Sequence, residues 1–525
     1  MVSRQVEPLR NHSGFVLARD KIVATTLLLI IGCAPQFGPV PRPAAVPLFV
    51  RVDSPFRAPL RRTKMMLHGA SRYSLAFALL ALPAVASAQA FGLNEIGSCA
   101  LARGFAVTGA VCDDASTIYW NPGAMPSKNG FSFYGGAAII KLNGAFTRDT
   151  SFRRYEANAP AAAVPHVFLN YRSGKAAYGI GVYVPYGLTS QWGDDFPGRF
   201  SAKKASLQTI YVQPNFSYQV TDNWSIGGGP VIGRSSVELV QGIDLSSTPT
   251  SAGGPTFGNL GIPKYTEFAR ATLKGSATAY GFNVGVHGNV TPNWQVGIRG
   301  LSQVSFAYDD ADATFAPVIT GLTLAANNPL GAPAGAPVDA LLAAQFTTGA
   351  LVAQKVKTNI QHPAQVQVGV GYTGFANTTL SVDYDYVGWK SFRQLPVNFQ
   401  GPAPSKVLVE NYNNTSSIRF GAEQRYAGGA ALRAGFAAAA SAAPPETVTP
   451  LLPEMDRALG MIGGALPLTG GLSLDATYSH IFTNGSRGRI DERSATSTTA
   501  QALALSSGAY TLSANIVSLS LKFGF

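Results

Sequence analysis

The side chains of this sequence that could act as a base, a nucleophile or a metal ligand are few and poorly placed for catalysis. Beyond residue 88 the histidines are His166, His287, His362 and His480, and only His480 has a serine, Ser479, beside it. Adjacent residues of a strand point to opposite faces, so these two cannot form a nucleophile–base pair. No G-x-S-x-G motif and no cluster with metal-ligand spacing occurs. We therefore expect no enzyme activity, no catalytic residues, no metal and no cofactor.

One long segment, residues 311–354, is suited instead to binding apolar compounds. It carries Phe315, Leu341 and Phe346 among many other apolar side chains, with few charges between them. Exposed apolar patches usually mark binding, and each buried CH₂ contributes about 0.8 kcal/mol. We expect first contact with an apolar ligand here. The alternative is that this segment packs on the neighbouring segment 241–267 and caps the protein, and both can hold together.

A ligand with a carboxylate would also need a cation, and Arg199, Arg234 and Arg299 lie in or near predicted strands. Arg234 shares its parity with Ile232, which is expected to face outward. An inward Arg234 therefore requires a bulge near residues 228–230, which the proline in that stretch makes plausible. The alternative for each arginine is a surface charge or an ion pair with an inward aspartate.

The elements that must position these residues are β-strands, as the end of the chain shows most clearly. The apolar residues Val517, Leu519, Leu521, Phe523 and Phe525 share one parity, and Ser518, Ser520, Lys522 and Gly524 share the other. Such a strand suits a membrane barrel with lipid outside and a wet lumen inside, although an edge strand of a soluble sandwich would look alike. Charged residues are only 13% of the chain, against about 25% in ordinary soluble domains. The mean hydropathy is only +0.12, and past the leader no apolar run reaches the roughly 20 residues of a spanning helix. Together these values favour the barrel, with a soluble all-β protein as the alternative.

Alternating segments separated by turn residues predict about fourteen antiparallel strands. The expected strand cores are 131–142, 165–172, 176–186, 205–220, 223–240, 268–290, 293–310, 355–373, 378–393, 413–426, 429–437, 457–467, 471–483 and 512–525. Six short connections alternate with seven long ones, which is the pattern of short periplasmic turns and long external loops. Charge on a lipid face costs roughly 2–4 kcal/mol at mid-bilayer, so Asp383, Asp385 and Asp475 should face the lumen.

A secretory signal peptide is predicted at residues 66–88, with an Ala-Ser-Ala cleavage site that ends at Ala88. We expect translation to start at Met65 or Met66, so that residues 1–64 are a disordered upstream extension, 65–88 the signal peptide and Gln89 the mature N-terminus. A lipoprotein-like leader at residues 21–33 is the alternative. The first 64 residues hold ten Lys and Arg and three Asp and Glu, so the net charge of +12 overstates that of the mature chain. No nucleic-acid partner is expected.

Residues 89–127 precede the barrel at 128–525 and show no clean strand alternation. A segment of about 40 residues is too small for a core of its own, so we expect it to form a plug, or hatch, in the lumen. Cys99 and Cys112 both lie in this segment, in an oxidising compartment. A disulfide between them is one alternative and two free thiols the other.

Several short motifs follow one another along the chain: Phe91-Gly92-Leu93-Asn94-Glu95, Asp113-Asp114-Ala115, Asn121-Pro122, Val184-Pro185-Tyr186-Gly187-Leu188, Pro197-Gly198-Arg199-Phe200, Thr221-Asp222-Asn223-Trp224-Ser225, Asp383-Tyr384 with Gly388-Trp389, and Leu452-Pro453-Glu454-Met455-Asp456-Arg457. In this order and spacing they resemble the FadL family of outer-membrane transporters for long-chain fatty acids and hydrocarbons. The third residue of the family's hatch motif is usually alanine, whereas here it is Gly123. Glycine loosens a backbone, so the hatch turn is expected to be more mobile.

The resemblance implies a fourteen-stranded barrel closed by a hatch. A ligand would land on apolar external loops, move to a pocket against the hatch and leave sideways through the barrel wall. It also implies a gating turn at Asn121, Pro122 and Gly123, and substrate contacts at Phe91 and at an inward basic Arg234. The expected partners are fatty acids, alkanes or aromatic hydrocarbons, together with outer-membrane lipid and lipopolysaccharide, around a monomer. A general porin for small polar solutes is the alternative, and a lipid-modifying outer-membrane enzyme is the weaker one.

Overall fold

The computed structural model describes residues 90–124, 126, 129–250, 254–328, 330–490 and 508–524. The chain divides into residues 1–80 and 81–525, and every described residue belongs to the second unit. The expected upstream extension, the signal peptide and Gln89 lie outside the described residues. Among the helices of the described ranges, none is both long and apolar enough to cross a membrane.

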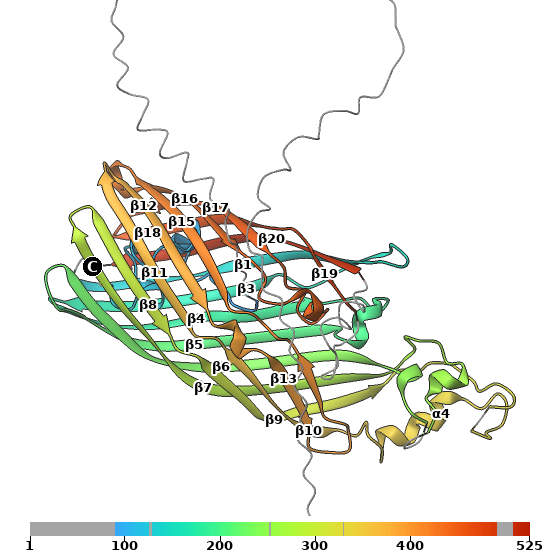
Figure 1. Ribbon diagram of the computed structural model, residues 1–525. Helices are drawn as coiled ribbons and strands as arrows, with labels where there is room; N and C mark the ends of the chain where they lie inside the picture. The colour runs from blue at the N-terminus through green and yellow to red at the C-terminus, as the bar shows by residue number, and fades with distance from the viewer. Residues whose placement is uncertain are drawn as a thin grey trace, which may run out of the picture. The chain divides into compact units, whose positions relative to one another are not determined.

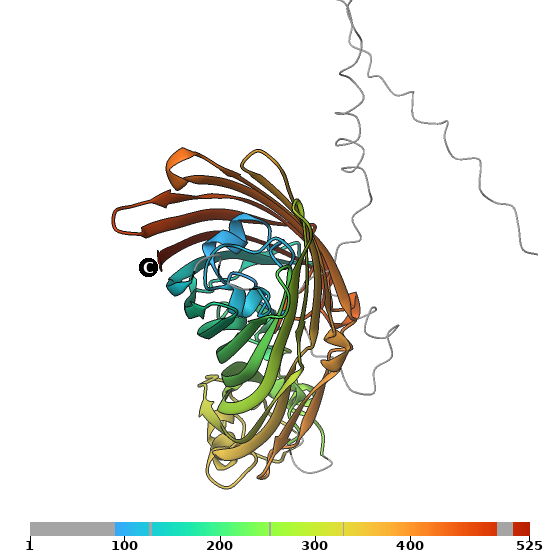
Figure 2. The same cartoon turned by 90° about the vertical axis from the view of Figure 1, so that its left-hand side faces the viewer.

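The described strands form a closed antiparallel barrel of 14 spans, as predicted (Figures 1 and 2). The first and last spans pair from Ser132 with Gly524 to Arg148 with Gly508, which closes the wall. In chain order the spans are β1 (Gly130–Arg148), β3 (Ala162–Ser173), β4 (Ala176–Gln191), β5 (Lys204–Gln219), β6 (Trp224–Asp244), β7 (Glu267–Thr291), β8 with β9 (Trp294–Leu301 and Val304–Pro317), β10 with β11 (Gln354–His362 and Gln365–Phe375), β12 (Thr378–Val387), β15 (Thr415–Arg425), β16 (Ala431–Ala439), β17 (Arg457–Pro467), β18 (Leu472–Thr483) and β20 (Gly508–Gly524).

Shorter elements lie in the hatch and in the connections. They are the strands β2 (Arg154–Glu156), β13 (Gln394–Phe399), β14 (Lys406–Val409) and β19 (Ser486–Gly488), the helices α2 (Ser98–Ala102), α3 (Thr117–Trp120) and α4 (Val338–Leu342), and the 3₁₀ turns η2 (Pro197–Phe200), η3 (Leu245–Ser247), η4 (Phe257–Leu260), η5 (Ala343–Phe346), η6 (Trp389–Ser391), η7 (Ala427–Gly429) and η8 (Pro445–Thr447).

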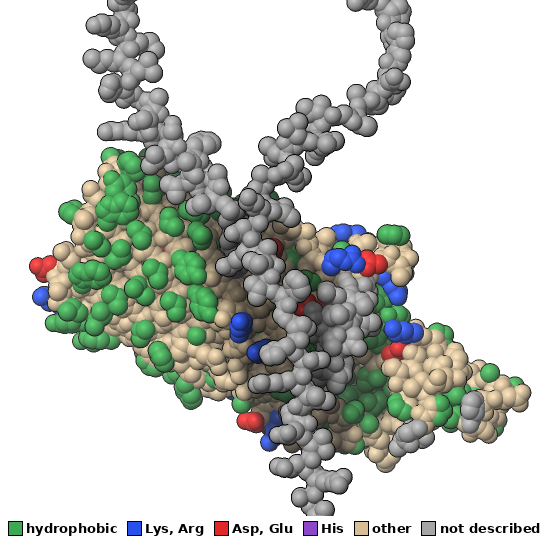
Figure 3. All heavy atoms as spheres, viewed as in Figure 1, with side chains coloured by type: hydrophobic (Ala, Val, Ile, Leu, Met, Phe, Trp, Pro, Cys, Tyr) green, Lys and Arg blue, Asp and Glu red, His purple; other side chains and the backbone are tan. Residues whose placement is uncertain are grey.

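Alternation of side chains decides which face of each strand meets lipid. In β12, Ser381, Asp383 and Asp385 are buried, whereas Val382 and Tyr384 are exposed. The predicted inward orientation of these aspartates is confirmed, and Asp475 of β18 is buried as well. Hydrophobic side chains cover the outer face of the barrel toward its short-turn end, while charged groups gather toward the loop-bearing half and the edges (Figure 3). The wall therefore presents an apolar belt outside, and its inner face carries both polar side chains such as Asp383 and apolar ones such as Leu459.

Several strands differ from the expected cores: β12 ends at Val387 instead of residue 393, because a 3₁₀ turn follows at Trp389–Ser391, and β20 begins at Gly508 instead of residue 512. The strand β9 extends to Pro317, so Phe315 belongs to the barrel wall rather than to the external loop. Two neighbouring spans are interrupted, at residues 302–303 and at residues 363–364, although β8 still pairs with β11 and β9 with β10. Pro363 has no N–H to donate to a ladder, which explains the second break. The six expected short connections are confirmed, and they join β3 to β4, β5 to β6, β7 to β8, β11 to β12, β15 to β16 and β17 to β18.

The predicted hatch lies against the inner face of the wall. Figure 2 shows it as the blue segment enclosed by the strands. Its polar groups bond inward side chains of distant strands: Ser98 contacts Ser520 of β20, Thr108 contacts Asp383 of β12, and the carbonyl of Ile118 accepts from Gln213 of β5. The hatch has no core of its own, and it is held instead by contacts with the inward side chains of the barrel.

Candidate functional site

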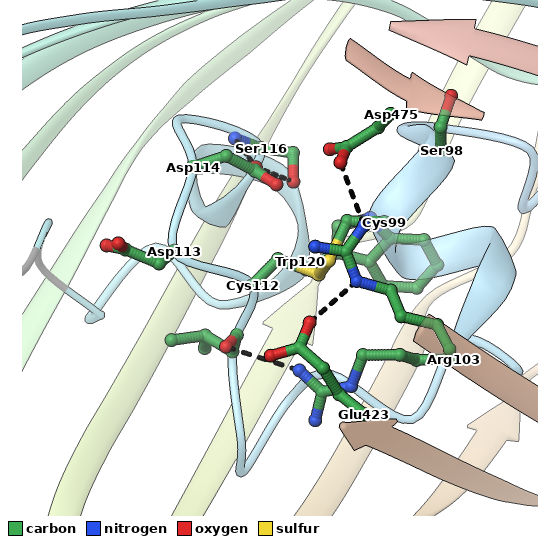
Figure 4. Close-up of a disulfide and its surroundings, with 12 residues drawn as sticks. Ser98, Cys99, Arg103, Cys112, Asp113, Asp114, Ser116, Trp120, Glu423 and Asp475 are labelled. Carbon is green, nitrogen blue, oxygen red and sulfur yellow. Dashed lines mark hydrogen bonds and ion pairs between the residues drawn. A yellow bond between two sulfur atoms is a disulfide. The ribbon is translucent and has the colours of Figure 1, made fainter. Parts of the chain in front are cut away.

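The hatch is cross-linked by the disulfide between Cys99 of α2 and Cys112, the first of the two alternatives (Figure 4). The N–H of Cys99 donates to the Tyr134 hydroxyl (3.0 Å), and that hydroxyl donates to Asp475 (3.1 Å). The disulfide closes a loop within a coreless segment, which restricts its unfolded states. These bonds attach the first half of the hatch to β1 and β18.

A buried charge network lies beside this disulfide (Figure 4). Arg433 of β16 donates to Glu423 of β15 (2.6 Å) and to Asp475 of β18 (2.9 Å). Arg103 of the hatch, 1% exposed, donates to Ser381 (3.2 Å). Arg433 thus links carboxylates of two other strands, and removing one partner of such a buried pair is strongly destabilising.

The hatch ends in the turn formed by Asn121, Pro122 and Gly123, which is fixed against the wall. The Asn121 amide donates to the carbonyls of Thr108 (2.8 Å) and Val286 (3.0 Å), and its side-chain oxygen accepts from the Gly123 N–H (3.1 Å). The Pro122 carbonyl accepts from Ser217 of β5 (2.6 Å). Asn121 therefore joins two parts of the hatch to β7.

Gly123 stands where backbone meets backbone. A Cβ atom added there would lie 2.4 Å from the carbonyl oxygen of Gly285 in β7. A Cβ atom would clash with β7 at this distance, so the position favours glycine here, whereas the family that the sequence resembles usually has alanine. Whether the turn is also more mobile stays a prediction.

Replacement of Gly123 by alanine is expected to push the turn off β7 and lower the free energy of unfolding by about 1–3 kcal/mol, the usual range for overpacking. Urea unfolding in detergent micelles measures this loss. Gly300→Ala is the matched control, because its added Cβ would meet Val284 at an ordinary 3.7 Å. Equal stability of the two variants would contradict the steric role.

A window interrupts the barrel wall between β3 and β4. The two strands pair from His166 with Tyr183 down to the short turn, while β3 residues 162–165 pair only with β1. At the loop end an isolated bridge joins Ala157 to Trp192. Between these points β4 follows the hatch instead of β3: Leu93 donates to the Pro185 carbonyl (2.8 Å) and Gly187 to that of Phe91 (2.9 Å). A register shift between Tyr183 and Tyr186 accompanies this bend.

A cavity of about 830 Å³ leads from the lumen through this window. It is lined by inward residues such as Leu459 and Ile481 and also by the outward Ile210 and Arg234, so it passes through the wall. Leu93 of the hatch and Leu188 of β4 line it at the window. The charged residues of its lining are Glu95, Lys204, Arg234, Glu238, Arg419, Glu454 and Arg457. Burial raises the pKa of Glu95 and of Glu454, so both carboxyl groups resist ionisation.

The expected inward orientation of Arg234 is wrong. Its side chain is exposed on the outer face and donates to Thr278 and Ser276 of β7. The pairing of β5 with β6 keeps one register on both sides of residues 229–231, so the bulge that would turn Arg234 inward is absent. Arg234 lies instead at the outer mouth of the cavity. A contact with substrate there stays a prediction.

The other candidate cations are engaged in contacts of their own. Arg199 of η2 pairs with Glu267 (2.9 Å), which matches the ion-pair alternative. Arg299 of β8 is 1% exposed, donates to Asn283 and Gln365, and lies over the Tyr119 ring at 4.1 Å. It does not line the cavity.

Phe91 lies in an aromatic cluster at the loop end of the lumen. Its ring centroid is 4.7 Å from that of Trp389 and 5.3 Å from that of Phe392. It lines a small apolar pocket of about 40 Å³ that Leu188 and Leu452 share with it. These two leucines also line the large cavity, so Phe91 is adjacent to the candidate path. Its contact with substrate stays a prediction.

The external segment 311–354 packs on the neighbouring segment 241–267, which was the alternative to a landing surface for ligand. Leu324, Val338 and Leu342 are buried together with Leu245, Phe257 and Phe268 from the neighbouring connection and strand. Phe346 is half-buried beside Phe268, with 6.4 Å between ring centroids, and Phe315 is half-buried beside Phe399. Leu341 remains 45% exposed and Ile319 86% exposed. Apolar side chains therefore remain exposed above a loop core, and their contact with substrate stays a prediction.

Sequence reasoning missed Ser417 and Arg419 of β15, which line the cavity. The signal was present, because both share the parity of the inward Glu423 and the opposite parity to the lipid-facing Phe420. It also missed that His166 of β3 bonds Ser520 of β20 (2.8 Å), a serine–histidine contact between residues distant in sequence. This pair is buried, lies off the cavity lining, and the second nitrogen of His166 has no partner among the described residues.

Comparisons with known proteins agree with this architecture. A family model described as "Outer membrane protein transport protein (OMPP1/FadL/TodX)" matches residues 79–525. The chain is 24% identical over 424 residues to the long-chain fatty acid transport protein of Escherichia coli O6:H1, covering 78% of this chain and 91% of that protein.

Two solved structures share the fold. One is a FadL homologue of Pseudomonas aeruginosa, with a TM-score of 0.68, 20% identity and coverage of 83% of this chain and 100% of the other. The second is the toluene transporter TodX of Pseudomonas putida, with a TM-score of 0.59, 15% identity and coverage of 83% and 100%. Because the family model spans most of its length, this chain belongs to the OMPP1/FadL/TodX family of outer membrane transport proteins.

Proposed function

We propose that this protein transports hydrophobic compounds, long-chain fatty acids or hydrocarbons, across the outer membrane by diffusion. The observation that carries the proposal is the cavity that runs from the hatch through the window between β3 and β4. The names of similar proteins support the proposal, since one is a long-chain fatty acid transport protein and another is a toluene transporter. The ligand would land on the external loops, enter the cavity and leave sideways into the membrane.

The energetics favour this route over an aqueous one. An acyl chain gains about 0.8 kcal/mol for each CH₂ removed from water, so it is best served by an apolar path that ends in lipid. The cavity offers Leu93, Leu188, Leu459 and Ile481 along that path. The partners are accordingly hydrophobic small molecules on one side and membrane lipid, including lipopolysaccharide, on the other, with the protein acting as a monomer.

The porin alternative would need an axial route for water. A second, polar cavity of about 470 Å³ lies at the short-turn end and is lined by Val111, Asp113, His287 and Arg425. The hatch separates it from the window, and residues of the hatch are buried against the wall around it. An enzyme is also not favoured, because neither His166 nor Ser520 is among the residues that line the two cavities described above.

Liposome uptake tests the function. Proteoliposomes with the native protein are expected to take up radiolabelled oleate faster than protein-free liposomes and to exclude a small radiolabelled sugar. Uptake of the sugar at a rate comparable to oleate would identify a general porin. Release of altered lipid products from the liposomes would identify an enzyme.

First contact on the loops gives a separate prediction. Leu341→Asp is expected to reduce oleate uptake about threefold to tenfold, since the burial of one leucine is worth up to about 1.5–3 kcal/mol. The barrel should remain folded, because Leu341 lies outside the loop core. Uptake and heat-modifiable migration on gels measure the two effects.

The control is Ala344→Asp, which adds the same charge at an exposed position of the same loop but removes no large apolar side chain. Equal losses in both variants would point to charge rather than contact. Normal uptake in Leu341→Asp would show that the ligand lands elsewhere.

A further inference from the structure

Arg234 lies at the outer edge of the apolar belt, where β5, β6 and β7 change together from apolar to polar side chains. Outward side chains of these strands pair in rows, first an apolar row and then increasingly polar ones: Val212 with Ile232 and Tyr280, then Ile210 with Arg234 and Thr278, then Gln208 with Ser236 and Ser276. Arg234 is therefore the first charged side chain beyond the apolar part of this wall.

The position of Arg234 along β6 places it at the outer boundary of the hydrocarbon layer. The strand begins at Trp224, beside a short turn, and Arg234 follows ten residues later. At about 3.3 Å per residue and a tilt of about 40°, ten residues rise about 25 Å, which is the height of the apolar band of a membrane barrel. Because the long connections of such barrels are external, Arg234 lies at the head-group level of the outer leaflet.

The outward side chains around Arg234 carry more positive than negative charge. In rows 204–208, 234–238 and 274–278 of this described part of the wall, Glu238 is the only carboxylate, and it already pairs with Lys204 (2.7 Å) and Lys274 (3.3 Å). Arg234 donates to two neutral hydroxyls of β7 and forms no ion pair with a described carboxylate. A guanidinium has five N–H groups, so these two bonds leave others for an anion.

The surroundings confine this positive patch to the window side of the wall. Beyond β7, Asp310 and Asp312 of β9 are paired with Lys355, so negative charge borders the patch there. On the other side, Arg234 and Ile210 line the outer mouth of the cavity that passes through the window. An anion at Arg234 would therefore lie beside the mouth.

We propose that Arg234, supported by Lys204 and Lys274, binds a phosphate of lipid A, the membrane-embedded part of lipopolysaccharide, at the outer mouth of the window. Arginine is suited to phosphate because its planar fork matches the phosphate oxygens. The acyl chains of the same molecule would lie on the apolar row of Ile232 and Tyr280, directly below the phosphate. The inference rests on the proposed function, in which lipopolysaccharide is a partner, and it names the residues that hold this partner.

Equilibrium binding of radiolabelled lipid A to the purified, detergent-solubilised protein tests this site. The two probes are bisphosphorylated lipid A and the same lipid A with both phosphates removed, which share their acyl chains. The native protein is expected to bind the phosphorylated probe at least about fivefold more tightly, as one basic residue at an anionic membrane surface gives. Arg234→Gln should remove most of that preference and leave binding of the dephosphorylated probe within about twofold.

Glu238→Gln should act in the opposite direction. This change removes the carboxylate that pairs with Lys204 and Lys274 and makes both available to the phosphate, so the phosphorylated probe is expected to bind about fivefold more tightly than to the native protein. Opposite effects at two neighbouring outward positions do not arise from loss of folding. Lys175→Gln is the matched control, because it removes one exposed positive charge from the short turn at the other end of the barrel.

Equal binding of the two probes by the native protein, an unchanged preference in Arg234→Gln, or no gain of affinity in Glu238→Gln would overturn the lipid A site. An equal loss in Lys175→Gln would show a response to the net charge of the barrel and would also overturn it. Equally strong competition by phosphatidylglycerol would identify a general contact with anionic lipid instead of lipid A. Each of these results, with normal oleate uptake by the native protein, would leave the transport function intact, whereas absent oleate uptake would contradict that function.

Discussion

A tryptophan in place of Ala162 is expected to reduce uptake of hydrophobic compounds to roughly a tenth of the native rate or less. Ala162 pairs with Ile140 of β1, whose side chain is buried, so it faces inward at the edge of the window. It lines the cavity, and about 830 Å³ of space can accept an indole without repacking the wall. A tenfold fall corresponds to a barrier raised by about 1.4 kcal/mol.

Oleate uptake by proteoliposomes that contain equal amounts of folded protein measures the effect. Ala307→Trp is the control, because Ala307 is exposed on the outer face of β9, away from the window. Native uptake in Ala162→Trp would mean that the ligand does not pass between β3 and β4. Equal losses in both variants would mean that the substitution acts on the barrel in general.

The largest effect on stability is expected from Glu423→Gln. Glu423 is 2% exposed and bonds the buried Arg433, which also bonds Asp475. Removing one member of a buried ion pair leaves an uncompensated charge and typically costs about 3–5 kcal/mol. Glutamine keeps the size of the side chain, so the loss reflects charge rather than a cavity.

Urea unfolding of the native and variant proteins in micelles gives this difference. The control is Arg425→Gln, which breaks the contact of Glu423 with an arginine that is 53% exposed. Water screens the half-exposed Arg425, and Glu423 keeps its buried partner Arg433 in this variant, so the loss should be several-fold smaller than in Glu423→Gln. Equal losses in the free energy of unfolding of the two variants would show that the buried ion pair between Glu423 and Arg433 does not stabilise the barrel more than the contact with Arg425 does.

The alternation of side chains along the sequence predicted the strands of the wall well, because each successive residue of a strand faces either the lipid or the lumen. The inward Asp383 and Asp385 and the order of short and long connections followed from a period of two and from turn residues alone. Arg234 also follows this alternation, although it was expected not to. Its parity indicated an outward side chain, and the resemblance to a family had suggested an inward one. The strand kept its register, and parity was right.

The resemblance implied a pocket against the hatch and a sideways exit, but the position of the window could not be predicted from the sequence, because it depends on contacts between distant segments. The strand β4 leaves β3 only where Phe91 and Leu93 of the hatch offer it other hydrogen bonds. The external loop was ambiguous for a different reason. A packed loop core and an exposed landing surface require the same apolar composition, and only the fold separates the buried Leu342 from the exposed Leu341.

The most direct test of sideways exit is photo-crosslinking with a fatty acid that carries a diazirine at the end of its tail. The ligand is bound to the native protein in proteoliposomes, irradiated and located by mass spectrometry of the digested barrel. Labels are expected on residues 159–165 of the β3 side and 187–191 of β4, which line the window. Labels confined to Val111, Asp113 and Arg425 around the polar cavity at the short-turn end would instead show an axial route and contradict the account.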